Sequence, residues 1–406
     1  MTHAPQIRRI LLAKGVRAFG DGFVSVLLPI YLLKLGLGPL QVGIIATATL
    51  LGSGVLTLAV GLRAHHFAFR TLLLAAAALM AATGLGFAFV TAFWPLLLIA
   101  IVGTLNPSSG DVSVFLPLEH AVLSRLVDDR ARTAVFARYS LVGALAAAVG
   151  SLAAAAPSMI GGITGLSMLS SIQAMFVVYA ALGVAAAIAY RGLPATADSA
   201  GPRTAVPLRE SKKRIYTLAA LFSLDAFGGG FVVQSMIALW LFQRFGMSLA
   251  TAGVIFFWTG ILTAVSYLVA VRIAGRFGLI NTMVFTHLPS SVCLVLVPFM
   301  PDLGWAIALL FVRAALSQMD VPTRSSYVMA IVSVAERPAA ASITSVPRSL
   351  ASAASPFLAG WLLTISSFGW PLLAAGGIKI VYDLFLFMLF RNVRPPEEQR
   401  GPTAGT

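Results

Sequence analysis

Cysteine is almost absent from this chain of 406 residues, and charge is scarce. The single cysteine, Cys293, excludes an intramolecular disulfide and a metal site built from cysteines. Charged residues make up only 10% of the sequence, whereas a typical soluble domain carries about 25%. Hydrophobic residues reach 59% and the mean hydropathy is +0.92, too much apolar surface for a soluble fold of this length to bury. The composition therefore predicts a membrane protein whose surface is solvated by lipid.

The sequence also lacks the motifs of membrane enzymes and pumps. It holds no nucleotide-binding loop, which argues against ATP-driven pumping. It holds no histidine-rich cluster, and His65 and His66 are too isolated for a metal site. No loop on the side predicted to face away from the cytoplasm is long enough for a catalytic domain. We therefore expect no enzyme activity, no cofactor and no metal.

Acidic residues number 14 against 28 lysines and arginines, which gives a net charge of +14. Such a charge would suit nucleic acid, but the basic residues are scattered through short loops between hydrophobic segments. There they set the orientation of a membrane protein instead, so we expect no nucleic-acid partner.

Alternate loops differ sharply in charge. One set holds little beyond Lys34, Arg244 and Asp302. The other set is basic and holds Arg63 and Arg70; Arg125, Arg130, Arg132 and Arg138; Arg203, Arg209, Lys212, Lys213 and Arg214; Arg272 and Arg276; Arg337 and Arg348; Arg391, Arg394 and Arg400. Positive loops stay in the cytoplasm. We therefore place both termini there, with the chain in the inner (plasma) membrane of a bacterium.

An all-α fold of twelve membrane spans is predicted from the hydrophobic segments. A helix needs about 20 apolar residues to cross the bilayer. Twelve segments meet this length, at 9–35, 39–61, 70–91, 95–118, 138–157, 168–190, 214–243, 249–271, 279–299, 304–332, 346–367 and 370–391. Pro157, Gly161 and Gly162 are expected to mark a turn after the fifth span.

The two halves of the chain are a duplication. Residues 18–24 recur as residues 226–232, with six of seven identical at an offset of 208. Arg17 stands before the first copy where Asp225 stands before the second. The proline-containing, charged stretch 192–213 reads as a cytoplasmic linker. We therefore expect two parallel six-helix bundles, 1–191 and 214–406.

The architecture and two motifs resemble the major facilitator superfamily, in particular its bacterial efflux-like members. The family's loop between the second and third helices of each half reads like Gly-x-x-x-Asp-Arg-x-Gly-Arg. The second half keeps Ala274-Gly275-Arg276-Phe277-Gly278, and the first half reads Gly61-Leu62-Arg63-Ala64-His65-His66. Asp21 followed by Pro29 is similar to the family's first-helix aspartate motif. The fourth span lacks the arginine of drug/proton antiporters, and the fifth lacks their Gly-Pro motif.

The resemblance implies that helices 1, 4, 7 and 10 line a central cavity, and the sequence places most of its intramembrane charge on these four helices. A charge at mid-bilayer costs at least about 2.5–3.5 kcal/mol on insertion scales, so each should face water or a partner. The substrate- or ion-binding candidates are Arg17, Asp21, Asp111, Asp225, Arg313, Asp320 and Arg324. Arg63 and Arg276 are candidates for gating contacts in the loops, with ordinary topology charges as the alternative.

The spacing of these charges leaves two interpretations open. Arg17 and Asp21 lie four residues apart, and Arg313, Asp320 and Arg324 fall on one helical stripe. In the functional interpretation, the carboxylates bind a proton or cation and the arginines hold an anionic group. In the structural one, Arg17–Asp21 and Asp320–Arg324 are ion pairs that hold helices together.

Four further expectations concern structure rather than transport. We predict that Lys379 and Asp383 form a structural ion pair and that Glu119 and His120 are solvated at a cytoplasmic helix end. His287 is predicted to be a satisfied helix histidine. Asn106-Pro107 and Asp320-Val321-Pro322 are expected to interrupt the fourth and tenth spans.

The sequence as a whole favours a secondary active transporter. We expect a monomer in the lipid bilayer that moves a small organic solute by alternating access, coupled to protons or another ion, in the direction of efflux. Proton-coupled uptake of an organic anion through Arg17, Arg313 and Arg324 is the alternative within the same class. A non-transporting membrane sensor or scaffold is the alternative outside it.

Overall fold

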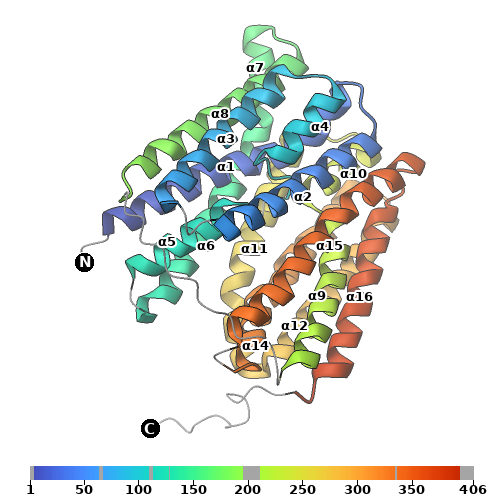
Figure 1. The fold of residues 1–406 in the computed structure, drawn as a ribbon. Coiled ribbons are helices and arrows are strands. Elements are labelled where there is room, and N and C mark those ends of the chain that lie inside the picture. Colours follow the sequence, from blue (N-terminus) through green and yellow to red (C-terminus); the bar gives the residue numbers. More distant parts are fainter. Residues whose placement is uncertain are drawn as a thin grey trace. The chain divides into compact units, whose positions relative to one another are not determined.

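The computed structural model describes residues 4–63, 67–108, 113–127, 129–194, 211–333 and 336–393, and these residues form helices joined by short turns (Figure 1). The helices of the first half are α1 (Ala4–Lys34), α2 (Pro39–Arg63), α3 (Phe69–Phe89), α4 (Phe93–Val102), α5 (Phe115–Leu126), α6 (Asp129–Leu152), η2 (Ala153–Ala155), α7 (Ala156–Thr164) and α8 (Met168–Arg191). Those of the second half are α9 (Lys212–Gly230), α10 (Gln234–Phe245), α11 (Leu249–Phe277), α12 (Leu279–Leu296), η3 (Val297–Phe299), α13 (Leu303–Ser317), α14 (Asp320–Ala330), α15 (Arg337–Ile365) and α16 (Trp370–Phe390).

The described helices make twelve membrane spans, six in each half. Ten segments are both long and apolar enough to cross a bilayer. The remaining two spans are α15 and the α4–α5 segment, in which α4 alone has only 10 residues. Helices satisfy their own backbone hydrogen bonds, which is why they can cross lipid. The fold is therefore that of an all-α membrane protein with a six-plus-six arrangement.

Two spans are broken where prolines predict it. Residues 103–114 separate α4 from α5, and Pro107 lies in this gap; its carbonyl oxygen accepts a hydrogen bond from the backbone N–H of Ser235 at 3.1 Å. In the tenth span, α13 ends at Ser317 and α14 begins at Asp320, two residues before Pro322. Both predicted interruptions are confirmed.

The predicted turn after the fifth span is wrong in position. Pro157 lies in the first turn of α7, so its missing N–H costs no helical hydrogen bond, and the helical path continues to Thr164. The chain turns instead at Gly165, whose φ of 73° is left-handed and caps the helix end.

The chain forms two compact units. The first comprises Met1–Pro202, Val233–Ile261 and Pro356–Ser367, and the second comprises Arg203–Val232, Leu262–Ser355 and Phe368–Thr406. The division at the linker 192–213 that the sequence predicts stays a prediction, since residues 195–210 lie outside the described part of the chain.

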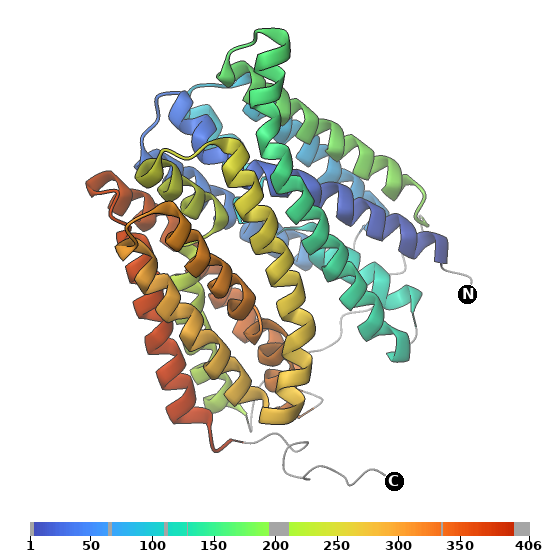
Figure 2. The same ribbon diagram turned by 180° about the vertical axis from the view of Figure 1, so that it is seen from behind.

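In the first unit, α1 packs against α6 and α8, and α3 packs along α8 (Figures 1 and 2). The duplicated glycine motif explains the closest of these contacts. A Cβ atom at Gly22 would collide with the backbone oxygen of Ala147, and one at Gly150 would collide with the backbone of Phe19. The two backbones thus meet directly, as small residues allow in membranes.

The second copy of the motif has the same packing role in the second unit. There Gly230 of α9 lies against the backbone oxygen of Ser352 and the side chain of Ser355, both on α15. The hydroxyl of Ser355 also donates to the carbonyl oxygen of Phe227 at 2.5 Å. The repeated sequence therefore has a repeated structural role, the close packing of the first span of each half on the fifth.

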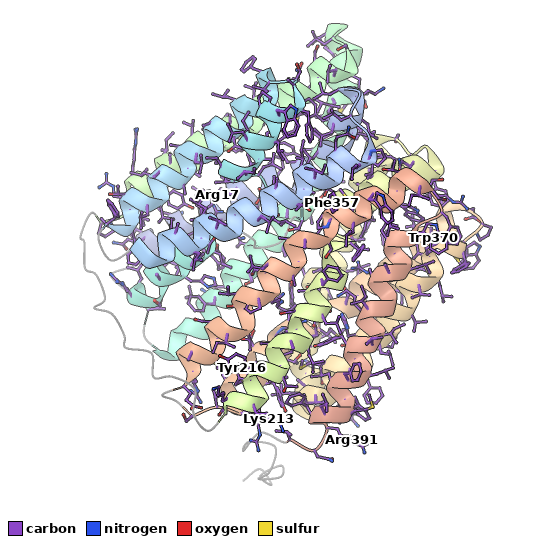
Figure 3. The ribbon with its side chains drawn as sticks, turned by 45° about the vertical axis from the view of Figure 1, so that its right-hand side comes forward. Arg17, Lys213, Tyr216, Phe357, Trp370 and Arg391 are labelled. Atoms are coloured by element: carbon purple, nitrogen blue, oxygen red, sulfur yellow. The ribbon has the colours of Figure 1, made fainter. Side chains whose placement is uncertain are left out.

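Basic and aromatic residues lie at opposite ends of the second unit. Figure 3 shows Lys213 and Tyr216 at the start of α9 and Arg391 at the end of α16, gathered at one end. Trp370, which begins α16, lies at the other end.

Segments from the second half of the sequence also pack within the first unit. Gly43 of α2 faces Gly360 of α15, and a Cβ atom on Gly43 would come within 3.0 Å of the Gly360 Cα. The backbone N–H of Phe357 donates to Thr47 Oγ1 at 2.9 Å, and Figure 3 places Phe357 on α15. We call this contact between α2 and residues 356–367 the glycine seam.

Candidate functional site

A fully buried ion pair joins α1 to α5. The Arg17 guanidinium contacts Glu119 Oε2, and Glu119 is 0% exposed. The hydroxyl of Tyr139, from α6, donates to Glu119 Oε2 at 2.5 Å, and that of Tyr190, from α8, donates to Glu119 Oε1 at 2.6 Å. Both carboxylate oxygens are thereby satisfied, which a buried charge requires.

The Arg17 guanidinium also has partners besides Glu119. Arg17 Nε donates to the Tyr190 hydroxyl at 3.1 Å, and the ring of Phe115 lies 3.9 Å from the Arg17 Cζ. A cation over an aromatic face gains electrostatic energy when it is desolvated. The prediction that Glu119 is solvated at a helix end is wrong: Glu119 lies in the second turn of α5, where its partners from α1, α6 and α8 bury it.

Lys14 lies one turn before Arg17 and is also buried. Its Nζ lies 5.0 Å from the centre of the Tyr139 ring. Gly143 provides the space, because a Cβ atom there would collide with the Lys14 side chain. The first unit thus buries two cations and Glu119 within a few turns of each other.

Asp21 lies one turn after Arg17 and contacts neutral groups. The Tyr179 hydroxyl lies 3.4 Å from Asp21 Oδ1 and 3.4 Å from the carbonyl oxygen of Thr104. Asn106 also hydrogen-bonds to the Asp21 side chain. Thr104 and Asn106 both follow the end of α4 at Val102, so Asp21 lies beside the interruption of the fourth span.

In the second unit Asp225 is the centre of a larger cluster. Its Oδ2 lies 2.9 Å from Arg324 Nη2 of α14, and its Oδ1 lies 2.6 Å from Lys379 Nζ of α16. Arg324 also pairs with Asp320, one turn earlier on α14, as the spacing predicts. Two of the three guanidinium nitrogens of Arg324, Nε and Nη1, are buried without a hydrogen-bond partner among the described residues.

A histidine extends this cluster. His287 Nδ1 lies 2.9 and 3.0 Å from the two oxygens of Asp383, and His287 Nε2 lies 3.5 Å from Lys379 Nζ. His287 is therefore satisfied inside a helix bundle, as expected. The predicted Lys379–Asp383 pair is wrong: Lys379 binds Asp225 of α9 and Asp383 binds His287 of α12. Both partners come from other helices, which the spacing along one helix cannot reveal.

The structure brings the remaining candidates together only in part. Arg313 lies on α13, so the turn at residues 318–319 breaks the stripe predicted for Arg313, Asp320 and Arg324. Arg276 is exposed near the end of α11, 5.6 Å from the Phe277 ring. Asp111 lies outside the described residues, as does the side chain of Arg63, the last residue of α2. Across the described residues, no three His, Cys, Asp or Glu side chains are placed to hold a metal ion.

The two clusters follow one plan with reversed charge. In the first half an arginine on the first span meets a carboxylate on the fourth, Arg17 with Glu119. In the second half a carboxylate on the first span meets an arginine on the fourth, Asp225 with Arg324. The Arg17–Asp225 difference within the duplicated motif is therefore matched by a reversal at its partner.

Comparison with known proteins agrees with this architecture. The sequence profile described as Major Facilitator Superfamily matches residues 10–241 and 218–406. An uncharacterized membrane protein of Saccharomyces cerevisiae is 23% identical over 413 residues, covering 93% of this chain and 92% of that protein.

Solved structures give the same fold. A point mutant of the nucleoside transporter NupG matches with a TM-score of 0.75 at 13% identity, over 95% of this chain and 100% of that one. A bacterial homologue of the human lysosomal transporter Spinster, inward-facing and occupied, matches at 0.75 and 14%, over 95% and 96%. The human organic anion transporter MFSD10 matches at 0.65 and 15%, over 95% and 100%.

The chain belongs to the Major Facilitator Superfamily, the class of twelve-span secondary transporters. It is a multi-pass membrane protein, and the family points to transport of a small molecule rather than to enzyme activity.

Proposed function

We propose that this protein is a proton-coupled secondary transporter that exports a small organic solute by alternating access, with Asp21 as the proton-binding group. We place it in the inner membrane of a bacterium with both termini in the cytoplasm. Asp111, Asp225 and Asp320 are the alternative coupling carboxylates.

One observation carries the proposal: Arg17 is neutralised by Glu119, so it does not need Asp21 as a counter-charge. Asp21 instead contacts the neutral groups Tyr179 and Asn106 beside the break in the fourth span. A carboxylate held inside a membrane bundle is a functional candidate, because its burial is costly. Its twin position, Gly229, shows that the shared backbone does not require an acid there.

Asp21→Asn tests the coupling. We expect the variant to bind and exchange substrate while it loses uphill, proton-driven transport in proteoliposomes with an imposed pH gradient. Tyr179→Phe is the matched control, since it removes a hydrogen-bond donor to Asp21 and leaves the carboxylate in place. Undiminished substrate-dependent proton movement in Asp21→Asn would exclude this residue as the coupling site.

Uptake of an organic anion is the second candidate, favoured by Arg324. Its Nε and Nη1 are buried and have no partner among the described residues, so they are donors left for an acceptor. MFSD10, the human relative in fold, is an organic anion transporter, although 15% identity shows the fold alone. Flux assays with inside-out and right-side-out vesicles separate export from uptake, and an anion screen separates the substrates.

A further inference from the structure

We infer that a groove along α1 and α6 is a binding site for a phospholipid with an anionic headgroup. The groove has a volume of about 1110 Å³, as large as the pockets that hold drug-sized ligands. It lies entirely within the first unit, apart from both charged clusters.

The walls of the groove are apolar along one face of each helix. On α1 the lining residues recur at helical spacing, from Arg8 through Leu12 and Gly15 to Phe19. On α6 they include Leu145 and Val149. Leu12 is 62% exposed and Val149 is 48% exposed, so these side chains need an apolar environment that the protein itself does not supply.

The shape of the groove follows from how the two helices meet. Near Phe19 and Gly150 their backbones are in direct contact, which closes one end. At Gly15 the nearest neighbour of a Cβ atom would be Val142 Cγ1 at 3.5 Å, an ordinary side-chain contact. The backbones of the two helices are therefore in direct contact near Phe19, whereas the contact at Gly15 is between side chains.

The end of the groove near the start of α1 carries positive charge. Arg8 and Arg9 are both exposed and both line the groove. Arg9 donates to the carbonyl oxygen of Gly192 after α8, which fixes its guanidinium at this end. Guanidinium groups bind phosphate oxygens through paired hydrogen bonds, and two of them favour a headgroup with a net negative charge.

The length of the groove matches one leaflet. From Arg8 to Phe19 the helix rises by about 16 Å, at about 1.5 Å per residue, and half of the hydrocarbon core is about 15 Å. A phosphate at the arginines would therefore place an acyl chain along the apolar walls as far as Phe19. This agreement of charge, polarity and length is why we assign a phospholipid rather than a soluble ligand.

Native mass spectrometry of the purified full chain with phosphatidylglycerol or phosphatidylcholine tests the site. The wild type is expected to retain phosphatidylglycerol in preference to phosphatidylcholine. Arg8→Gln should weaken phosphatidylglycerol retention about fivefold, the effect of one arginine near an anionic surface, whereas Arg8→Lys should retain it. Lys213→Gln, which removes an exposed cation elsewhere, is the control and should retain it fully.

A second variant tests the apolar walls of the groove. Gly15→Leu fills the groove and should reduce retention of phosphatidylglycerol, whereas Gly377→Leu, at an exposed glycine of α16, should not. Equal retention of the two lipids by the wild type, or unchanged retention in both Arg8→Gln and Gly15→Leu, would overturn the proposal. Thermal unfolding of each variant in detergent without added lipid separates lost lipid from lost fold.

Discussion

Glu119 shows how much one buried carboxylate can organise. Its carboxylate pairs with Arg17 and accepts hydrogen bonds from Tyr139 and Tyr190, which belong to three different helices. Its neighbours in the sequence, His120 and Arg125, instead suggest a solvated helix end. Nothing in the sequence around Glu119 marks it as buried, because its burial depends on partners from α1, α6 and α8. The wrong prediction of a Lys379–Asp383 pair has the same cause, because the partners of both residues lie on other helices. Pairing within a helix gains only about 0.2–0.5 kcal/mol, so buried partners on other helices decide the contacts.

Glu119→Gln should destabilise the protein strongly. The substitution leaves Arg17 buried without its counter-charge, which costs about 3–5 kcal/mol. We expect a clear fall in melting temperature and in folded yield, and partial recovery in the double variant with Arg17→Gln. Tyr139→Phe, which removes one hydrogen bond to a charged group, should cost less, about 1.5–3 kcal/mol. A melting temperature unchanged in Glu119→Gln would contradict the role assigned to the pair.

At the scale of single helices, prolines and glycines are the most informative signals. Pro107 and Pro322 correctly predict the two interrupted spans, because a proline acts on the helix that contains it. Pro157 does not end its helix, since a new helical turn begins at it. The partner helix of a glycine is not readable from the sequence: Gly22 and Gly230 occupy matching positions, but only the structure identifies α6 and α15 as their partners.

Gly230 and Gly229 offer a matched pair for testing this packing. A Cβ atom at Gly230 would collide with the backbone oxygen of Ser352, so Gly230→Ala should cost about 1–3 kcal/mol through overpacking. At Gly229 the nearest atom would be Lys379 Nζ at 3.7 Å, an ordinary contact. Gly229→Ala should therefore be neutral or stabilising by up to about 1 kcal/mol. Thermal unfolding compares the two, and equal melting temperatures would refute the assignment.

For the molecule as a whole, hydropathy and duplication were sufficient to predict twelve spans and the family. They do not predict that segments 233–261 and 356–367, from the second half, pack within the first compact unit. This packing rests on contacts such as Gly43 with Gly360, and a glycine carries no sequence signal that names its partner. The sequence does not identify the substrate either, because substrate binding depends on contacts made across many helices.

Under the proposed alternating access, we expect the glycine seam to open during transport. Cysteines at Thr47 and Phe357, in a Cys293→Ala background, replace two residues joined by a hydrogen bond of 2.9 Å. We expect oxidation to cross-link them and to stop transport, with recovery after reduction. Gly43→Leu should lower the cross-linking yield by forcing the two helices apart. Full transport by the cross-linked protein would show that the seam stays closed.

The orientation of the whole chain can be tested with the same cysteine-free background. The alternating charge of the loops predicts that cysteines at Arg276 and Arg337 react with impermeant reagents only from the cytoplasmic side. A cysteine at Trp370, at the other end of the second unit from Lys213, should react only from outside (Figure 3). Labelling of Arg276→Cys from outside intact cells would reverse the proposed topology.

The contacts of the glycine seam have a consequence for its response to salt. Backbone surfaces and a neutral hydrogen bond hold Gly43, Thr47 and residues 356–360 together, and these contacts carry no formal charge. Dissolved salt screens interactions between charges within about 8 Å at physiological ionic strength and leaves van der Waals contact unaffected. Changes in ionic strength should therefore leave the contacts of the glycine seam at full strength, whereas they weaken ion pairs at the surface of the protein.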